Sequence, residues 1–216
     1  TAMMKIQRFI FNLFEENTYV LYDTESREAI VVDPGMSTER ERDAFNDFIA
    51  ENHLHISAIV NTHLHLDHSF GINHIKERYG AKLTAEKADA DLAASLSAQA
   101  ARFGIRLPED FGIDIDNTVD GDSSFDFDGH RVELIAVPGH TRGGMAIYIP
   151  DLKIVFSGDS LFGGAIGRTD LPGGDHRQLV ESIRNRLLTL PDDTTVLPGH
   201  MEPTTIGDER RNNPYL

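Results

Sequence analysis

Residues 61–70 read NTHLHLDHSF and place three histidines and one aspartate within six positions. These side chains are His63, His65, Asp67 and His68. Imidazole and carboxylate groups are common ligands of divalent metal ions, and so dense a polar group is unsuited to an apolar core. The stretch therefore predicts a metal site.

Three later segments, AVPGH, VFSGD and TVLPGH, each read as an apolar strand followed by glycine and one metal-capable residue. Those residues are His140, Asp159 and His200. Glycine lets the backbone turn sharply, and α/β folds place their chemistry in loops at strand ends. If these strand ends converge with the first motif, all seven side chains meet at one site.

Seven ligands are too many for one four-coordinate ion but suit two ions roughly 3.5–4 Å apart that share a hydroxide. We expect Asp159 to bridge the ions, and Asp67 and Asp159 to be the catalytic carboxylates. The remaining ligands divide into two sets, which are His63, His65 and His140 for one ion, and Asp67, His68 and His200 for the other.

Composition narrows the choice of metal and partner. The chain has no cysteine, so its metal ligands are nitrogen and oxygen atoms, which suit zinc, iron, manganese or nickel alike. We expect two divalent ions, with zinc as the prediction and iron or manganese as alternatives. A net charge of −15 disfavours nucleic acid and anionic membranes as partners. Without an apolar run of roughly 18 residues or a signal segment, we expect a cytoplasmic protein. The oligomeric state is not predicted.

Strand and helix patterns alternate along the chain and predict one α/β domain over residues 3–216. Thr1 and Ala2 look like an added remnant. Hairpins interrupt the alternation, which favours two mixed sheets with helices outside them. The acidic segment 111–130 is interpreted as loops around a strand or hairpin, with a calcium loop as the alternative. The expected strands are 5–11, 17–23, 28–35, 56–62, 131–140, 144–159 (a hairpin) and 194–200, and the expected helices are 37–52, 71–80, 86–103 and 176–190.

The order of these motifs resembles the metallo-β-lactamase superfamily. The pattern THxHxDH matches from Thr62 to His68, and it is followed by GH, GD and GH at the three later turns. VVDPG at 31–35, GRTDLPGGD at 167–175 and the ending from residue 199 make the chain most similar to short, single-domain bacterial members of the glyoxalase II group. The resemblance implies a four-layer αββα sandwich of two mixed sheets flanked by helices, and the same division of ligands between two metals.

The resemblance also implies the reaction, which is hydrolysis of a thioester such as S-lactoylglutathione by a metal-bridging hydroxide. Full-length glyoxalase II enzymes hold glutathione with a C-terminal helical domain that we do not expect here, so another acyl-thiol stays open as the substrate. One alternative is a persulfide dioxygenase with a single iron held by the equivalents of His63, His140 and Asp159. Another is a superfamily hydrolase of lactones or β-lactams.

Three residues near the motifs have two interpretations each. Arg168 is a candidate for substrate binding, and Asp170 is its partner in the purely structural interpretation. Asp33 is expected to orient a metal ligand or its loop by hydrogen bonds instead of binding metal itself. Phe162 either lines the pocket or packs in the core.

Overall fold

The computed structural model describes residues 3–216, so the expectation for Thr1 and Ala2 lies outside the described range. Its contacts divide the chain into two compact units, the first up to Ala85 with Asp89–Thr118 and the second made of Glu86–Ala88 with Val119–Leu216. A single domain over 3–216 stays a prediction. Within the described residues, no helix combines the length and apolar character needed to cross a membrane.

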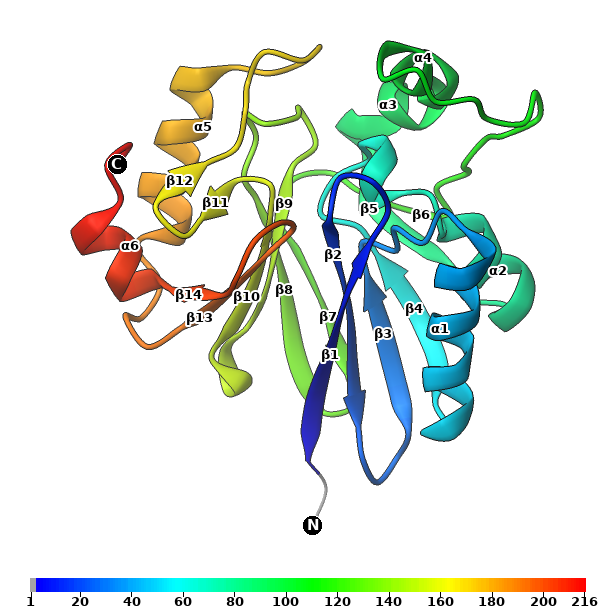
Figure 1. Ribbon diagram of the computed structural model, residues 1–216. Helices are drawn as coiled ribbons and strands as arrows, with labels where there is room; N and C mark the ends of the chain where they lie inside the picture. The colour runs from blue at the N-terminus through cyan, green and yellow to red at the C-terminus, as the bar shows by residue number, and fades with distance from the viewer. Residues whose placement is uncertain (1–2) are drawn as a thin grey trace. The chain divides into compact units, whose positions relative to one another are not determined.

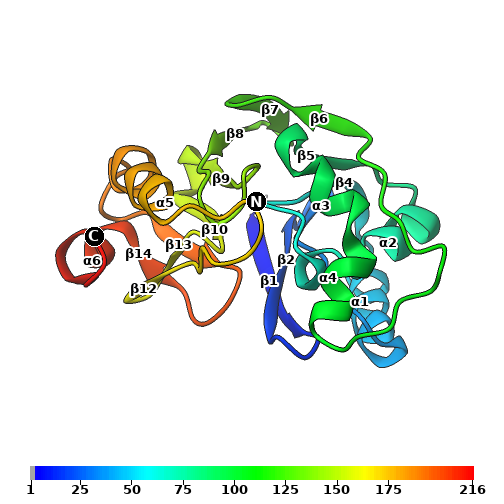
Figure 2. The ribbon, with the colours of Figure 1, turned by 90° about the horizontal axis from the view of Figure 1, so that it is seen from above.

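The first unit is a mixed sheet with helices on one face (Figures 1 and 2). Its strands follow chain order, with antiparallel pairs from β1 to β3 and parallel pairs from β3 to β5. The bounds are β1 Met4–Phe11, β2 Glu16–Asp23, β3 Glu28–Val32, α1 Glu39–Glu51, β4 His55–Val60, a 3-10 turn Leu66–His68, α2 Ile72–Tyr79, β5 Leu83–Glu86, α3 Ala90–Ala94, α4 Leu96–Arg102 and β6 Asn117–Val119.

Helix α1 begins where its sequence provides a cap. The hydroxyl of Thr38 accepts a hydrogen bond from the backbone of Glu41, whose carboxylate accepts from the backbone of Thr38 in return. The helix then presents Phe45 and Ile49 to the core, where Ile72 and Ile75 of α2 join them. The core of this unit therefore lies between the sheet and its helices.

The second unit is also a mixed sheet, in the order β14-β13-β10-β9-β8-β7, with helices against it. Strands β10 and β13 are parallel and the other neighbours are antiparallel. Leu179, Ile183 and Ile206 of the helices pack on the sheet. The bounds are β7 Ser123–Phe127, β8 His130–Ala136, β9 Met145–Ile149, β10 Ile154–Gly158, β11 Leu161–Phe162, β12 Ala165–Ile166, α5 His176–Ser182 continued by a π-helical turn Ile183–Leu187, β13 Thr195–Pro198, β14 Thr204–Thr205 and α6 Ile206–Asn212.

The predicted strands and most predicted helices are found, but the bounds of one helix differ, and the short elements β5, β11, β12, β14 and α6 were not predicted. The expected helix over 86–103 begins later than predicted, because Leu83–Glu86 forms β5, and Ser95 separates α3 from α4. The polar ending contains α6, where Thr205 accepts a hydrogen bond from the backbone of Asp208 as its N-cap. The acidic segment forms β6 and the hairpin of β7 and β8, as expected.

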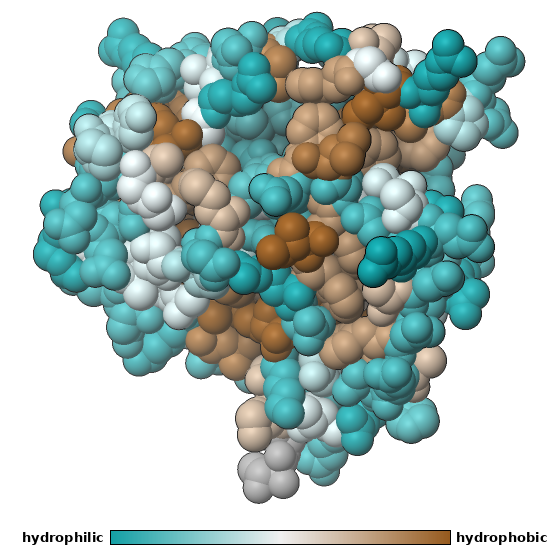
Figure 3. All heavy atoms as spheres, viewed as in Figure 1, coloured by the Kyte–Doolittle hydropathy of each residue, from teal (hydrophilic) through white to brown (hydrophobic). Residues whose placement is uncertain are grey.

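The surface shown in Figure 3 is largely hydrophilic, with separate hydrophobic groups among the polar ones. Large apolar side chains that are exposed in the first unit include Ile10 and Leu13, in β1 and the turn after it, and Phe103 at the end of α4.

Candidate metal centre

Each unit gathers its predicted ligands at one edge of its sheet. In the first unit, β3 and β4 are parallel neighbours, so Asp33 and the segment 61–68 both follow carboxyl ends at the same edge. In the second unit, β10 and β13 are parallel neighbours, and Asp159 and His200 follow their ends. Strand β8 runs in the same direction as β10, because β9 is antiparallel to both, and this brings His140 to that edge.

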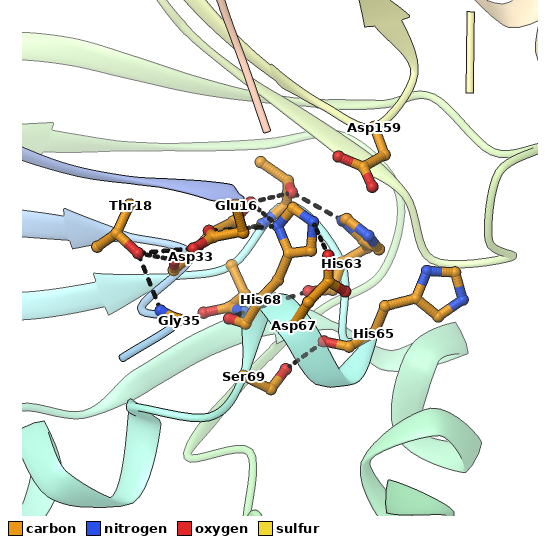
Figure 4. Close-up of polar contacts among 12 residues, drawn as sticks. Glu16, Thr18, Asp33, Gly35, His63, His65, Asp67, His68, Ser69 and Asp159 are labelled. Carbon is orange, nitrogen blue, oxygen red and sulfur yellow. Dashed lines mark hydrogen bonds and ion pairs between the residues drawn. The ribbon is translucent and has the colours of Figure 1, made fainter. Parts of the chain in front are cut away.

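In the first unit, Asp33 holds the histidine segment by three hydrogen bonds (Figure 4). Its carboxylate accepts from the backbone N–H and the hydroxyl of Thr62, at 2.7 and 2.6 Å, and lies 2.9 Å from Nδ1 of His68. A carboxylate only accepts hydrogen bonds, so Nδ1 of His68 carries the proton and its Nε2 carries the lone pair. This geometry suits the orienting role expected for Asp33.

The same carboxylate fixes the tautomer of His63 through Thr62. The Thr62 hydroxyl donates its proton to Asp33, so its oxygen accepts from Nδ1 of His63 at 3.0 Å. The lone pair of His63 is therefore at Nε2. Metal-binding histidines almost always have their second ring nitrogen held by such a partner. Asp33, His63 and His68 each place a donor atom within 4.8 Å of those of the other two.

Glu16 is a buried acid in this unit that the sequence analysis missed. One carboxylate oxygen lies 3.6 Å from Nδ1 of His68, and the other accepts from the Thr18 hydroxyl at 2.8 Å. Burial raises the pKa of the Glu16 carboxyl well above its usual range, although His68 opposes the shift. The available signal was an acid directly before the predicted strand 17–23.

Asn12 is a second residue that the sequence analysis missed. Its side-chain amide donates to the backbone carbonyls of Gly35 and Asp67, at 2.9 Å each, and thereby ties the turn after β1 to the metal segment. Gly35 leaves no space for a side chain here, because a Cβ would lie 2.1 Å from the Glu16 carboxylate and 2.5 Å from the carbonyl of Asp67. No sequence motif marked Asn12.

In the second unit, Asp159 lies between two histidines. One carboxylate oxygen of Asp159 is 3.5 Å from Nε2 of His140 and 3.4 Å from Nε2 of His200. Nδ1 of His140 lies 2.7 Å from the backbone carbonyl of Arg168, which only accepts, so the lone pair of His140 is at Nε2 and directed to Asp159. Phe162 is buried, with its ring edge-on to the ring of His200 at 6.3 Å between centroids.

The donor spacing fits a metal ion better than direct hydrogen bonding. Two donors that each lie about 2.0–2.1 Å from a tetrahedral ion are about 3.3–3.4 Å apart. The two Asp159 distances above, and the 3.4 Å between Nε2 of His68 and the Asp67 carboxylate, are close to that spacing and longer than ordinary hydrogen bonds. The nitrogen and oxygen donors of both units are thus suited to divalent ions.

Arg168 contributes to the second unit mainly through its backbone. Its side chain makes two parallel hydrogen bonds to Asp170, at 2.7 and 2.8 Å, and the pair is exposed to solvent. Hydrogen bonding to Arg168 lowers the pKa of Asp170 to about 2. Arg168 therefore pairs with Asp170, as in the structural interpretation, and its contact with a substrate stays a prediction.

Gly167 is a further residue with a clear local role. A Cβ at this position would lie 1.8 Å from the carbonyl of Asp159 and 3.2 Å from Nδ1 of His140. Only glycine lets the segment 167–170 approach the two ligands so closely. The sequence motif GRTD contained this residue, but the reason for its glycine appears only in three dimensions.

The two sheets, their helices and these ligand sets are features of one large class of metal-dependent proteins. The family model described as "Metallo-beta-lactamase superfamily" matches residues 12–200, and the chain belongs to this superfamily. The fold prediction is confirmed by this match and by the two mixed sheets.

Among curated relatives, the hydroxyacylglutathione hydrolase GloC of Haemophilus influenzae is 36% identical over 214 residues, which cover 99% of this chain and 98% of that protein. The crystal structure of BLEG-1, a B3 metallo-β-lactamase, has a TM-score of 0.89 at 29% identity, covering 98% of this chain and 99% of that one. The crystal structure of TTHA1623 in a di-iron-bound form has a TM-score of 0.83 at 32% identity, and the match covers 97% of this chain and 100% of that one.

Proposed function

We propose that this chain is a binuclear metal-dependent hydrolase that acts on a thioester, either S-lactoylglutathione or a related acyl-thiol. The placement of Asp159 between His140 and His200 carries the proposal, because one carboxylate with an imidazole on each side is suited to bridging two ions. The similarity to a hydroxyacylglutathione hydrolase along nearly the whole chain supports the substrate class.

The proposed site uses the seven ligands predicted from the sequence. His63, His65 and His140 would hold one ion, Asp67, His68 and His200 would hold the other, and Asp159 would be shared by both. The Nε2 lone pairs derived above for His63, His68 and His140 support this division. Zinc is the proposed metal, and the di-iron form of a relative makes iron the first alternative, followed by manganese.

The ions, when bound, would supply an ionised water at neutral pH and polarise the thioester carbonyl. The protein's own contribution is orientation. Asp33 holds the protons of His63 (through Thr62) and His68 on Nδ1, and the Arg168 carbonyl does the same for His140. Asp67 and Asp159 are the proposed catalytic carboxylates, because each lies next to a ligand imidazole, Asp67 beside His68 and Asp159 beside His140.

Arg168 is the proposed substrate-binding residue, and the matched variant Asp170→Ala separates its two roles. If Arg168 contacts an anionic part of the substrate, Arg168→Ala raises KM by about 10-fold, as expected for one charge-assisted hydrogen bond, while Asp170→Ala leaves KM near that of the wild type. Equal effects of both substitutions would leave Arg168 with a structural role alone.

The proposed reaction is tested by assaying purified protein, after metal analysis, on a panel of thioesters, lactones, β-lactams and a persulfide while an electrode records oxygen. We expect two ions per chain and thioester hydrolysis without oxygen uptake. One iron per chain with persulfide-dependent oxygen uptake would establish the dioxygenase instead. Turnover of lactones or β-lactams alone would contradict the thioester assignment.

A further inference from the structure

The ligand segment of the first unit has a second set of contacts on the side away from its ligands. His63, His65 and Asp67 alternate with Leu64 and Leu66. The backbone N–H of Leu64 donates to the carboxylate of Asp89 at 3.0 Å, and that of Leu66 donates to the side-chain carbonyl of Gln99 at 2.9 Å. Two of the four peptide groups between His63 and Asp67 are therefore held by side chains from outside the segment.

Both acceptors come from the short helices α3 and α4. Asp89 is buried and directly precedes α3, and Gln99 is half-buried within α4. The amide of Gln99 also donates to the carbonyl of Leu92 at 2.9 Å, which fixes the orientation of its carbonyl oxygen towards Leu66. Gln99 therefore presents its acceptor in one direction before any ion is bound.

Packing fixes the same segment from the same side. The side chains of Leu64 and Leu66 are buried in the core cluster that contains Leu96 of α4. A buried N–H without an acceptor costs about 1–3 kcal/mol, so each peptide group has one favourable orientation while its acceptor is present. The direction of a peptide group sets the direction of the neighbouring Cα–Cβ bonds, which here belong to the ligands.

We propose that Gln99 and Asp89 are positioning residues of the metal centre, which aim the ligands His63, His65 and Asp67 through the backbone of Leu64 and Leu66. The inference rests on the proposed function, because it takes these three residues to be metal ligands. Loss of a group that orients a ligand typically lowers metal affinity by about 10–100-fold. For loss of Gln99 we expect a decrease in metal affinity near 10-fold, because this residue acts through one backbone hydrogen bond.

The test compares Gln99→Met with Gln99→Glu. Methionine keeps the length and packing of the side chain without the strong acceptor, whereas glutamate keeps an acceptor for Leu66, loses the bond to Leu92 and adds a negative charge. Metal-free protein is titrated with Co²⁺, whose visible absorption reports coordination geometry. We expect Gln99→Met to bind Co²⁺ about 10-fold more weakly with an altered spectrum, and Gln99→Glu to stay within about 3-fold of the wild type.

Folding is checked by urea denaturation of each metal-free variant. Gln99→Ala supplies a second measurement should the methionine variant fail to fold, because alanine is well tolerated within helices. It should also weaken Co²⁺ binding and alter the spectrum. Asp89→Asn retains an acceptor for Leu64 and should bind Co²⁺ much as the wild type does.

The outcomes separate this inference from the function it rests on. A wild-type chain that binds no Co²⁺ would contradict the proposed function and the inference together. A wild-type chain that binds two ions, with folded Gln99→Met and Gln99→Ala variants of unchanged affinity and spectrum, would overturn the inference alone.

Discussion

At the scale of single residues, a few hydrogen bonds decide which nitrogen of each histidine is available to a metal. Asp33 serves two histidines at once, His68 directly and His63 through Thr62. The Arg168 carbonyl serves His140 in the other unit. In all three histidines Nδ1 is the protonated nitrogen, so each imidazole has its lone pair on Nε2, the atom furthest from the backbone.

Removal of one ligand from each unit tests the residue assignments. We predict that His65→Ala and Asp159→Ala each lower turnover by more than about 100-fold and reduce the metal content, because losing a ligand costs more than losing its orienting partner. Atomic absorption and a thioester assay measure both effects. His55→Ala is the matched control, because His55 is exposed and pairs only with Glu28 among the ion pairs of the described residues. Full turnover with unchanged metal content in either ligand variant would refute the assignment of that residue.

The candidate ligands could be predicted from the sequence because they stand in short, regularly spaced motifs. Asn12, Glu16, Asp89 and Gln99 could not, because their contacts span from 25 to 55 residues of sequence or depend on burial. An acid or amide outside a motif is most often a solvated residue. Only the fold distinguishes these four from other polar residues of the chain.

At the scale of elements, glycines allow the turns that follow the strands to pack closely. Gly139 precedes His140 and has a φ of +137°. A Cβ there would lie 2.3 Å from the backbone of Leu179 in α5. The turn and the helix therefore pack without any side chain between them, and this fixes the position of His140 relative to α5.

A series of glycine substitutions separates strain from steric clash. We predict that Gly139→Ala destabilises the protein by about 3 kcal/mol or more, because both effects act there. Gly104→Ala should cost about 1–2 kcal/mol, because φ is +70° but the space is open. Gly112→Ala, with neither problem, should change stability by less than about 0.5 kcal/mol. Urea denaturation gives the three values, and a Gly139→Ala variant as stable as Gly112→Ala would contradict the packing described here.

Helices and strands were predicted correctly where the apolar periodicity was strong. Prediction failed where pairing with another strand determines the secondary structure. The helix expected over 37–52 is found as α1 at Glu39–Glu51, where Thr38 caps it and Phe45 and Ile49 are buried. Leu83–Glu86 lies beside an alanine-rich segment that favours helix, but pairing with β4 makes it a strand. Helix α6 had a threonine cap, acids in its first turn and arginines in its last, so its signal was present but short.

At the scale of the whole molecule, bound ions should contribute to stability as well as to chemistry. An ion present at 100 times its dissociation constant stabilises the folded state by about 2.7 kcal/mol. For a chain of 216 residues that binds two such ions, we therefore predict that exhaustive chelation lowers Tm by about 10–20 °C. Differential scanning calorimetry measures the change, and readdition of Zn²⁺ should reverse it. A Tm that is indifferent to chelation would contradict strong binding of metal to the folded protein.

The central claim of the proposed function is that the seven predicted side chains hold two ions. Anomalous diffraction at the absorption edge of the bound metal, recorded from crystals of the metal-loaded protein, tests it most directly. We predict two anomalous-difference peaks per chain. One should lie about 2.0–2.3 Å from donor atoms of His63, His65 and His140, the other at the same distance from those of Asp67, His68 and His200, with Asp159 contacting both. A single peak, or two peaks that lie away from these residues, would contradict it.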